Sequence, residues 1–254
     1  MPFTPDTQEK LAIVRTNLAT FGLLRTLGDV IGYLFTGPPR DRFDRTYGVA
    51  TSGIVDAGAG FSEPAAVTDA LRYVPISEQV MRYLLDDVTR RFDPSTLSFV
   101  DLGCGKGRAL VMASWYPFRS VLGVELSTHH AELAQRNLRD YLARPRRGTV
   151  RCDRVTVTCA NALTCDLPDG DLLIFMYRPF KGQVFQGVLD RLARLSAETG
   201  RRIVIAYVCP VEQRMLERHP GFAQLADVRV IVDEHRWSLW ETRRGPALVA
   251  AEAS

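Results

Sequence analysis

The sequence predicts an α/β protein with a doubly wound, mostly parallel sheet of seven strands. From residue 98 onward, short apolar runs alternate with stretches of helical periodicity, which is the pattern of repeated β-α units. Two further apolar runs, residues 228–233 and 237–241, are joined by a short polar turn and indicate an antiparallel hairpin. Repeated β-α units followed by a hairpin predict a sheet with one antiparallel strand.

Length and composition agree with one folded α/β domain. The chain has 254 residues, of which 46% are hydrophobic and 24% are charged, so it can bury a sizeable core. The net charge of +3 is too small to favour nucleic-acid binding. Arginines are densest over residues 144–154, which we interpret as a solvated loop, with an acidic partner as the alternative.

Cysteine usage and hydropathy argue against several protein classes. Five cysteines at irregular spacing, with no C-x-x-C pair, argue against a disulfide framework and against structural zinc, so we expect reduced thiols and no metal. No signal peptide is expected, and no apolar run reaches the roughly eighteen residues that a membrane span needs. The four histidines lack metal-ligand spacing and are expected at the surface. These observations predict a cytoplasmic protein.

The N-terminal part is expected to form a helical and loop cap over residues 1–70. Apolar residues recur at three- and four-residue steps over residues 8–35, which predicts one or two helices packed on the domain, with a dimer contact or a lid as the alternatives. Residues 36–62 are rich in glycine and lack periodicity, as in lids and binding loops. The main domain is assigned to residues 71–246 and a flexible tail to residues 247–254.

The remaining elements follow in order along the main domain. A helix is predicted over residues 76–91, because its apolar residues fall on one face. Strands are predicted before the hairpin at residues 99–102, 120–125, 155–159, 171–176 and 202–208. Helices are predicted between them at about 106–115, 131–142 and 183–197.

The strongest indication of a site is the segment DLGCGKGR, residues 101–108, between the first of these strands and its helix. Glycines there let the backbone turn sharply and let a ligand approach without a Cβ in the way. Dinucleotide-binding turns have the pattern G-x-G-x-x-G, whereas here the third glycine comes one residue early. Asp101 is a poor neighbour for a pyrophosphate and a good one for the ammonium of an amino-acid moiety. The segment therefore favours S-adenosylmethionine over NAD.

An acidic residue ends the second predicted strand. Glu125 follows Gly103 by 22 residues and can accept hydrogen bonds from both hydroxyls of a ribose. The alternative is that it caps the next helix, since Ser127 and Thr128 follow it. The combination of strand, glycine turn, helix, strand and acid favours the cofactor site.

The segments 99–108 and 121–127 resemble motifs one and two of class I, seven-strand S-adenosylmethionine-dependent methyltransferases, including uncharacterised bacterial members. The resemblance covers roughly residues 70–245 and implies their Rossmann-like fold. It implies that the glycine turn lines the methionine end, that Glu125 holds the ribose and that Leu126 packs on the adenine. Residues 160–162 match the adenine-contacting loop, with an amide where the family often has aspartate. The implied cofactor-binding residues are Tyr73, Asp101, Gly103, Cys104, Gly105, Gly107, Arg108, Glu125, Leu126, Asn161 and Ala162.

The acceptor side departs from the family pattern. The segment YRPF, residues 177–180, resembles the N-P-P-Y or N-P-F segment of amino-directed methyltransferases, but Tyr177 replaces the amide that orients a nitrogen nucleophile. A nucleic-acid base or glutamine target is therefore disfavoured. Tyr177 is the catalytic candidate, through its hydroxyl or through its ring face, which could hold a methylammonium-like group. Arg178 and Phe180 are candidate substrate contacts. The alternative is that Tyr177 and Phe180 are aromatic walls of the cofactor cleft.

Two segments upstream extend the resemblance. Residues 73–77, YVPIS, are similar to a segment before the glycine loop of seven-strand protein-lysine methyltransferases. Residues 47–53, YGVATSG, are similar to a loop of bacterial methyltransferase-like proteins and imply a lid with Tyr47, Thr51 and Ser52, with a surface turn as the alternative. A protein lysine is thus the expected methyl acceptor, and a small metabolite is the alternative. A cofactor-binding protein without turnover is a second alternative, and an NAD enzyme is disfavoured by the glycine spacing.

Overall fold

The computed structural model describes residues 42–53, 73–144, 148–229 and 236–243, together with isolated positions at 15, 18, 19, 22, 23 and 27. The helices expected over residues 8–35, their dimer contact, the arginines at 146 and 147, and the tail at 247–254 lie outside the described residues, apart from those isolated positions. No helix of the described part is long and apolar enough to cross a membrane.

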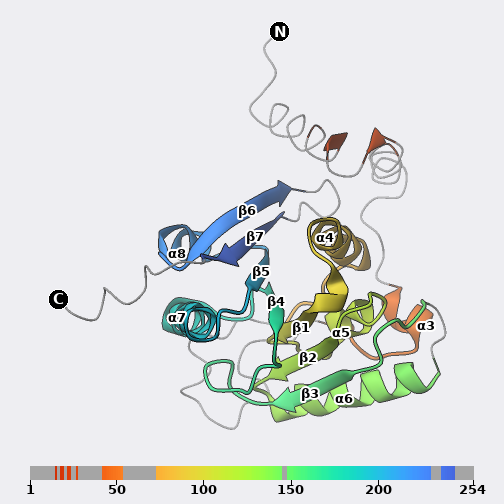
Figure 1. Ribbon diagram of the computed structural model, residues 1–254. Coiled ribbons are helices and arrows are strands. Elements are labelled where there is room, and N and C mark those ends of the chain that lie inside the picture. Colours follow the sequence, from red (N-terminus) through yellow and green to blue (C-terminus); the bar gives the residue numbers. More distant parts are fainter. Residues whose placement is uncertain are drawn as a thin grey trace.

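A seven-stranded sheet forms the centre of the molecule, with the strand order β3-β2-β1-β4-β5-β7-β6 (Figure 1). Strands β1 to β5 pair in parallel, and β7 runs antiparallel to both of its neighbours. This confirms the predicted sheet. Its strands are β1 (Leu97–Leu102), β2 (Ser120–Glu125), β3 (Val155–Cys159), β4 (Asp171–Tyr177), β5 (Ile203–Val208), β6 (Phe222–Arg229) and β7 (Arg236–Thr242).

Helices cover both faces of this sheet. Side chains alternate between the two faces along a strand, so Phe99 of β1 packs into one core and Val100 into the other. The first core is closed by α3 (Phe43–Tyr47), α4 (Glu78–Arg91), α5 (Arg108–Ala113) and α6 (Thr128–Ala143), and the second by α7 (Gly182–Thr199) and α8 (Gln213–Arg218). Strands β1 and β5 are buried along their whole length, as is typical of parallel strands covered on both faces.

The order of the strands reverses next to β1. The chain passes from β1 to β2 on one side and returns to β4 on the other side of β1. In open parallel sheets, the crevice at such a switch point, beyond the carboxyl ends of the strands, is where ligands bind. The glycine-rich segment 101–108 follows β1 at this edge.

Two short helices and one strand differ from the sequence prediction. Helix α8 and helix α3 were not predicted, and β6 begins at Phe222, six residues before the predicted start at residue 228. The middle of β6 is half-buried or exposed and shows no regular alternation, because it is the edge strand of the sheet.

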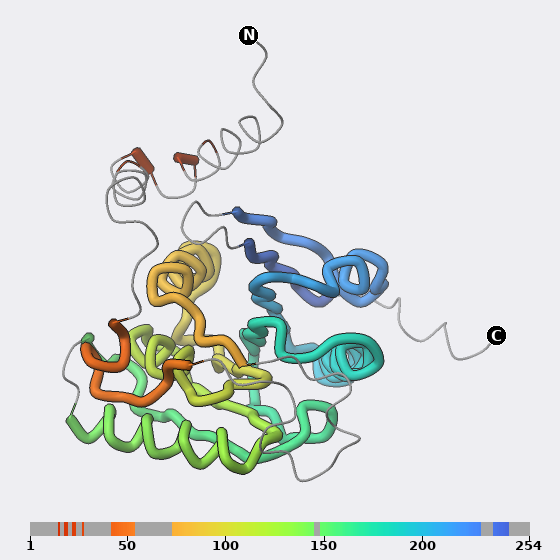
Figure 2. Tube along the Cα trace, turned by 180° about the vertical axis from the view of Figure 1, so that it is seen from behind, coloured from red at the N-terminus to blue at the C-terminus, as the bar shows by residue number. Residues whose placement is uncertain are grey.

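Residues 42–53, which we call the strap, pack against α5 and α6 (Figure 2). The strap contains α3, whose Tyr47 ring lies 4.9 Å from the ring of Trp115 and whose Tyr47 hydroxyl donates a hydrogen bond of 2.7 Å to Glu78. Tyr47 is only 2% exposed. It therefore anchors the strap in the core, and it is neither a surface turn nor a wall of the predicted cleft.

Candidate active site

A pocket lies at the carboxyl ends of β1, β2 and β4. Its empty volume is about 1040 Å³, which includes space open to solvent. It brings together most of the residues that the sequence predicted, and four predicted residues do not line it: Tyr47, Thr51, Ser52 and Gly107. The predicted residues that line it are Tyr73, Asp101, Gly103, Cys104, Gly105, Arg108, Glu125, Leu126, Asn161, Ala162, Tyr177, Arg178 and Phe180.

Asp101 is a buried carboxylate at the inner end of this pocket. It is 3% exposed, and none of the described residues donates a hydrogen bond to it. Burial raises the pKa of Asp101 well above its ordinary value, and the nearby Glu125 carboxylate raises it further. The side chain is therefore ready to bind a cationic group, which would supply the missing partner.

Glu125 connects the glycine turn to the start of α6. Its Oε2 accepts a hydrogen bond of 2.8 Å from the backbone N–H of Gly105, and its Oε1 accepts one of 2.8 Å from Ser127. Burial raises the pKa of Glu125, although these backbone hydrogen bonds oppose the rise. Each carboxylate oxygen has two lone pairs, so Glu125 retains acceptor capacity for a ligand.

The glycines of the turn are required by protein contacts. Gly103 has φ +83°, and a Cβ added there would lie 2.4 Å from the Cβ of Pro179. Gly105 has φ +53°, and a Cβ there would lie 2.3 Å from ring carbons of Tyr73. From the sequence, we expected glycine at these positions so that a ligand could approach the backbone. In the structure, Pro179 and Tyr73 occupy the space that the Cβ atoms would need.

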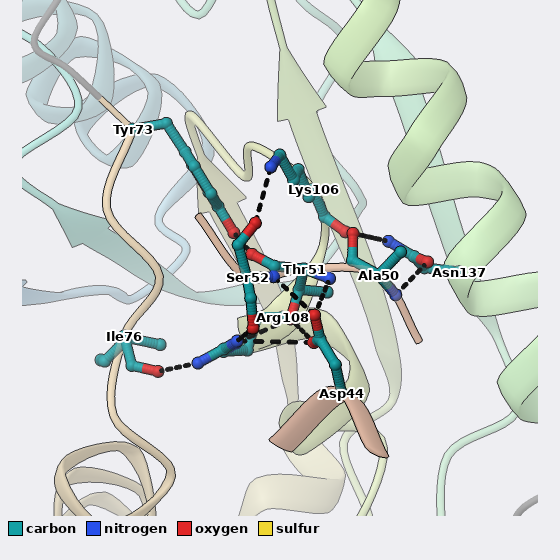
Figure 3. A network of polar contacts seen from close by, with 9 residues as sticks. All are labelled: Asp44, Ala50, Thr51, Ser52, Tyr73, Ile76, Lys106, Arg108 and Asn137. Atoms are coloured by element: carbon teal, nitrogen blue, oxygen red, sulfur yellow. Dashed lines mark hydrogen bonds and ion pairs between the residues drawn. The ribbon is translucent and has the colours of Figure 1, made fainter. Parts of the chain in front are cut away.

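The strap is fixed to the glycine turn by two cations that flank Gly107 (Figure 3). Lys106 Nζ donates a hydrogen bond of 2.8 Å to the carbonyl of Ser52. The Arg108 guanidinium donates to Thr51 Oγ1 at 2.8 Å, to Ser52 Oγ at 3.1 Å and to the carbonyl of Ile76 at 3.3 Å. The guanidinium of Arg108 is thus engaged by the strap, although the sequence assigned this residue to the cofactor.

Tyr73 closes the same network over Gly105. Its hydroxyl donates a hydrogen bond of 2.7 Å to the carbonyl of Thr51, and burial raises its pKa. Within the strap, Asp44 accepts hydrogen bonds from Thr51 Oγ1 at 2.6 Å and from the backbone of Ser52 at 2.7 Å. Thr51 and Ser52 therefore lie behind the glycine turn and support it, while Tyr73 covers it.

Two histidines correct the sequence prediction. His130 and His219 were expected at the surface, but both are buried. His130 lines the pocket, its ring centre lies 5.6 Å from that of Tyr73, and burial lowers its pKa. His219 accepts a hydrogen bond at Nδ1 from Gly221, and its Nε2 lies 3.0 Å from Asp190. The sequence pattern could not reveal these contacts. Tyr73 and Asp190, which contact His130 and His219, lie on segments far from them in the chain.

The outer side of the pocket carries the loop after β3. Asn161 Oδ1 accepts a hydrogen bond of 2.9 Å from the backbone of Leu163, which holds the loop in a tight turn. The carbonyl of Ala162 accepts one of 2.7 Å from Arg191 of α7. Leu126 is 38% exposed and lines the pocket beside this loop. An exposed apolar side chain there offers a flat ligand group a surface to pack on.

No protein-family model and no curated protein matches the chain. Among solved structures, a proposed methyltransferase, yhhF from Escherichia coli, superposes with a TM-score of 0.50 at 13% identity, over 76% of this chain and 100% of that chain.

The chain has the fold of the class I methyltransferases. Magnesium protoporphyrin IX methyltransferase from Synechocystis PCC 6803, solved with bound SAM, is 16% identical over 66% of this chain and 77% of its own, with a TM-score of 0.45. Precorrin-6y C5,15-methyltransferase from Geobacter metallireducens GS-15 is 20% identical over 68% of this chain and 94% of its own, with a TM-score of 0.47.

In this methyltransferase fold, the segment after β4 forms the remaining wall of the pocket. Tyr177, Arg178 and Phe180 all line it. Phe180 is buried and packs against Phe185 of α7, with ring centres 6.3 Å apart. The Tyr177 and Cys209 side chains are hydrogen-bonded, and the Arg178 Cζ lies 5.9 Å from the centre of the Tyr177 ring. Tyr177 and Phe180 are therefore both held in place as aromatic walls, and a cation already lies beside the Tyr177 ring.

Proposed function

We propose that this chain binds S-adenosylmethionine in the pocket and transfers its methyl group to an acceptor. The observation that carries the proposal is the Asp101 carboxylate, which is buried at the pocket and receives no hydrogen bond from the described residues. The ammonium of a methionine moiety would pair with it. Glu125, fixed by Gly105 and Ser127, keeps lone pairs for ribose hydroxyls, and Leu126 offers a surface for adenine.

The residues of the chain would act by holding the reactants and excluding water. S-adenosylmethionine supplies a methyl group on a positively charged sulfur, which makes that methyl electrophilic. Asp101 and Glu125 would fix its position, while the apolar walls Phe175 and Phe180 would exclude water, so that alignment and desolvation lower the barrier. The acceptor atom bonds to the methyl carbon as the carbon–sulfur bond breaks, and any proton it carries passes to bulk water once the methylated product leaves the pocket. Tyr177 would orient the acceptor at this end.

NAD fits the same pocket poorly. A pyrophosphate at the glycine turn would meet the carboxylates of Asp101 and Glu125, which both lie within the pocket. The pKa of each carboxyl is already raised by burial, and Glu125 raises that of Asp101 further. A polyanionic ligand would add to this repulsion.

Calorimetric titration with S-adenosylmethionine, S-adenosylhomocysteine and NAD tests the proposal. We expect the first two to bind and NAD not to bind. Glu125→Ala should weaken the affinity for S-adenosylmethionine about tenfold or more, because it removes a charged acceptor. Glu132→Ala, on the exposed side of α6, is the matched control and should leave the affinity unchanged. A protein that binds NAD but not S-adenosylmethionine would refute the proposal.

Turnover separates an enzyme from a binding protein without catalysis. The readout is release of S-adenosylhomocysteine in the presence of candidate acceptors. The resemblance of residues 73–77 favours a protein lysine as the acceptor. The charge of Arg178 favours the alternative, a small molecule, because a cationic lysine would have to approach a second cation at the acceptor end.

A further inference from the structure

We infer that Arg178 binds the methyl acceptor and that the acceptor carries an oxyanion, a carboxylate or a phosphate. The inference rests on the proposed function, because it assigns the acceptor end of the same pocket. Three observations support it: the position of Arg178 at the pocket, the absence of a described carboxylate partner for its guanidinium, and the distribution of charge along the pocket.

Arg178 lies at the carboxyl edge of the sheet, in an uncommon backbone conformation. Its φ is +40°, and that of Cys209 is +49°; these are the two non-glycine residues with positive φ in the described part of the chain. Each follows directly on its strand, and the last residues of the two strands, Tyr177 and Val208, are register partners. Two adjacent residues of the sheet edge thus share a conformation that L-residues rarely adopt, next to the pocket. Such outliers concentrate at functional sites.

Within the described part of the chain, no residue accepts a hydrogen bond from the guanidinium of Arg178, which lies beside the ring of Tyr177. Its Nε is buried and has no hydrogen-bond partner, and Arg178 forms no ion pair with a described residue. By contrast, Arg108, which lines the pocket, and Arg191, which contacts the loop after β3, donate hydrogen bonds to carbonyl oxygens. A guanidinium presents two parallel N–H groups that match the two oxygens of a carboxylate or phosphate. An oxyanion that meets the terminal N–H groups would therefore neutralise a guanidinium that pairs with no described carboxylate.

Two carboxylates and two arginines line the pocket, and one of these arginines, Arg108, already donates hydrogen bonds to Thr51 and Ile76. Asp101 and Glu125 lie on β1 and β2, at the end assigned to the donor. Arg178 follows β4, on the other side of β1. The first turn of α7 contributes Val184 to this side of the pocket, while Glu212, whose Oε1 accepts a hydrogen bond of 3.0 Å from the backbone N–H of Gly182, does not line the pocket. A donor with a cationic ammonium and an anionic acceptor would each meet the opposite charge.

A lysine acceptor does not fit this distribution. Its ammonium would approach Arg178, and the ring of Tyr177 already has the Arg178 guanidinium 5.9 Å from its centre. An anionic acceptor would be held by Arg178 and by the aromatic walls Tyr177 and Phe180, with its nucleophilic atom free to meet the methyl group. The nucleophile forms the new bond to carbon, the electron pair of the carbon–sulfur bond stays on sulfur, and the acceptor proton passes to water.

Titration of the protein loaded with S-adenosylhomocysteine tests the inference. The probes are benzoate and phenyl phosphate, which separate the two oxyanions, and benzylamine and benzamide, which are cationic and neutral analogues. We expect at least one anion to bind and the amine and amide not to bind. Arg178→Met should weaken that binding about tenfold or more, and Arg178→Lys should restore only part of it, because it keeps the charge and loses the planar fork.

Two controls make the result specific. Arg194→Met, on the exposed side of α7, removes the same charge and should leave anion binding unchanged. The affinity for S-adenosylhomocysteine should be the same in both methionine variants, which shows that Arg178→Met is folded.

The inference is overturned if neither anion binds to the loaded protein, if anion binding survives Arg178→Met, or if benzylamine binds more tightly than benzoate. Failure of the proposed function gives a different result. If S-adenosylhomocysteine does not bind, while benzoate or phenyl phosphate still binds through Arg178, the oxyanion site is supported and the cofactor assignment is not.

Discussion

At the scale of single residues, the two carboxylates at the inner end of the pocket differ in the hydrogen bonds that they accept. Glu125 receives hydrogen bonds from the backbone of Gly105 and of Ser127, whereas Asp101 receives none from the described residues. Burial, and then the charge of Glu125, raises the pKa of Asp101 in the free protein. A carboxyl with a raised pKa stabilises the fold most below the pKa of the unfolded chain, about 3.9, and its contribution falls as pH rises toward the folded value. At neutral pH, Asp101 thus lowers the stability of the ligand-free protein.

The affinity for S-adenosylhomocysteine should therefore rise with pH through the pKa of Asp101. The ammonium of the ligand favours the ionised carboxylate, so below the pKa of Asp101 in the free protein, binding is coupled to release of a proton. Calorimetry at several pH values, in buffers of different ionisation enthalpy, measures both the affinity and the number of protons released. Asp101→Asn should weaken binding by about 2 kcal/mol at neutral pH and should abolish this component of the pH dependence. An unchanged pH profile in Asp101→Asn would contradict the pairing.

Gly105 offers a second test at this scale, because the chain contains a matched control. Gly105→Ala would place a Cβ 2.3 Å from the Tyr73 ring at φ +53°, whereas Gly200→Ala, at φ +70°, meets nothing within 4 Å. Both variants have the left-handed backbone cost, about 1–2 kcal/mol, but only the first displaces Tyr73. We expect Gly105→Ala to lose more free energy of unfolding in urea and to weaken cofactor binding. Equal losses in the two variants would show that Tyr73 yields without cost.

At the scale of elements, the strap depends on contacts that are distant in sequence. Its helix α3 has only five residues, far fewer than an isolated helix needs, so its burial against α4, α5 and α6 must stabilise it. Burial raises the pKa of Asp44, but hydrogen bonds from Thr51 and Ser52 lower it by a larger amount. The pKa of Asp44 is therefore below its ordinary value. A lowered carboxyl pKa stabilises the fold above the unfolded value and loses that effect as pH falls through the folded value. The strap is therefore held by an ionised Asp44 at neutral pH.

Arg108→Met should release the strap. The variant removes hydrogen bonds to Thr51, Ser52 and Ile76 and leaves buried acceptors unsatisfied, which should cost about 2–4 kcal/mol. Hydrogen exchange should accelerate over residues 44–53, and the affinity for S-adenosylmethionine should fall as the glycine turn loses its support. Arg136→Met, on the exposed face of α6, is the control for the loss of one charge. Unchanged exchange in the strap would show that its other contacts, the Tyr47 ring and the hydrogen bonds from Lys106 and Tyr73, hold it without Arg108.

The elements that could be predicted from the sequence are those with local causes. The strand, glycine turn and helix at residues 97–113 follow from an apolar run and three glycines with positive φ. Strand β6 was placed too late, because an edge strand with half-buried residues lacks the alternation that marks a strand. The burial of Tyr47 and His130 could not be predicted, because it depends on packing between segments far apart in the chain. For the same reason, the hydrogen bonds from Arg108 to the strap could not be predicted from the sequence.

At the scale of the whole molecule, the site is concentrated on one part of the sheet. The pocket draws on β1, β2, β4, the loop after β3, residues 73–76 and the first turns of α5, α6 and α7, while β6, β7 and α8 contribute no described residue to it. The strap joins this part through Arg108 and Lys106. The hairpin β6–β7 extends the sheet at the far edge, where it pairs with β5 alone. Binding energy from a cofactor should therefore be distributed unevenly over the fold.

Hydrogen exchange with and without S-adenosylhomocysteine should map this division. A ligand that binds only the native state slows every local opening that releases it, and at a hundredfold excess over Kd this amounts to about 2.7 kcal/mol. We expect slower exchange at residues 101–109, 124–130, 160–162 and 73–76, and also in the strap, which does not line the pocket but supports the glycine turn. Residues 213–229 and 236–242 should change little, since they can open without disturbing the site. In Asp101→Asn the same map should appear only at higher ligand concentration. Protection confined to the hairpin, or absent from the glycine turn, would place the ligand elsewhere on the molecule.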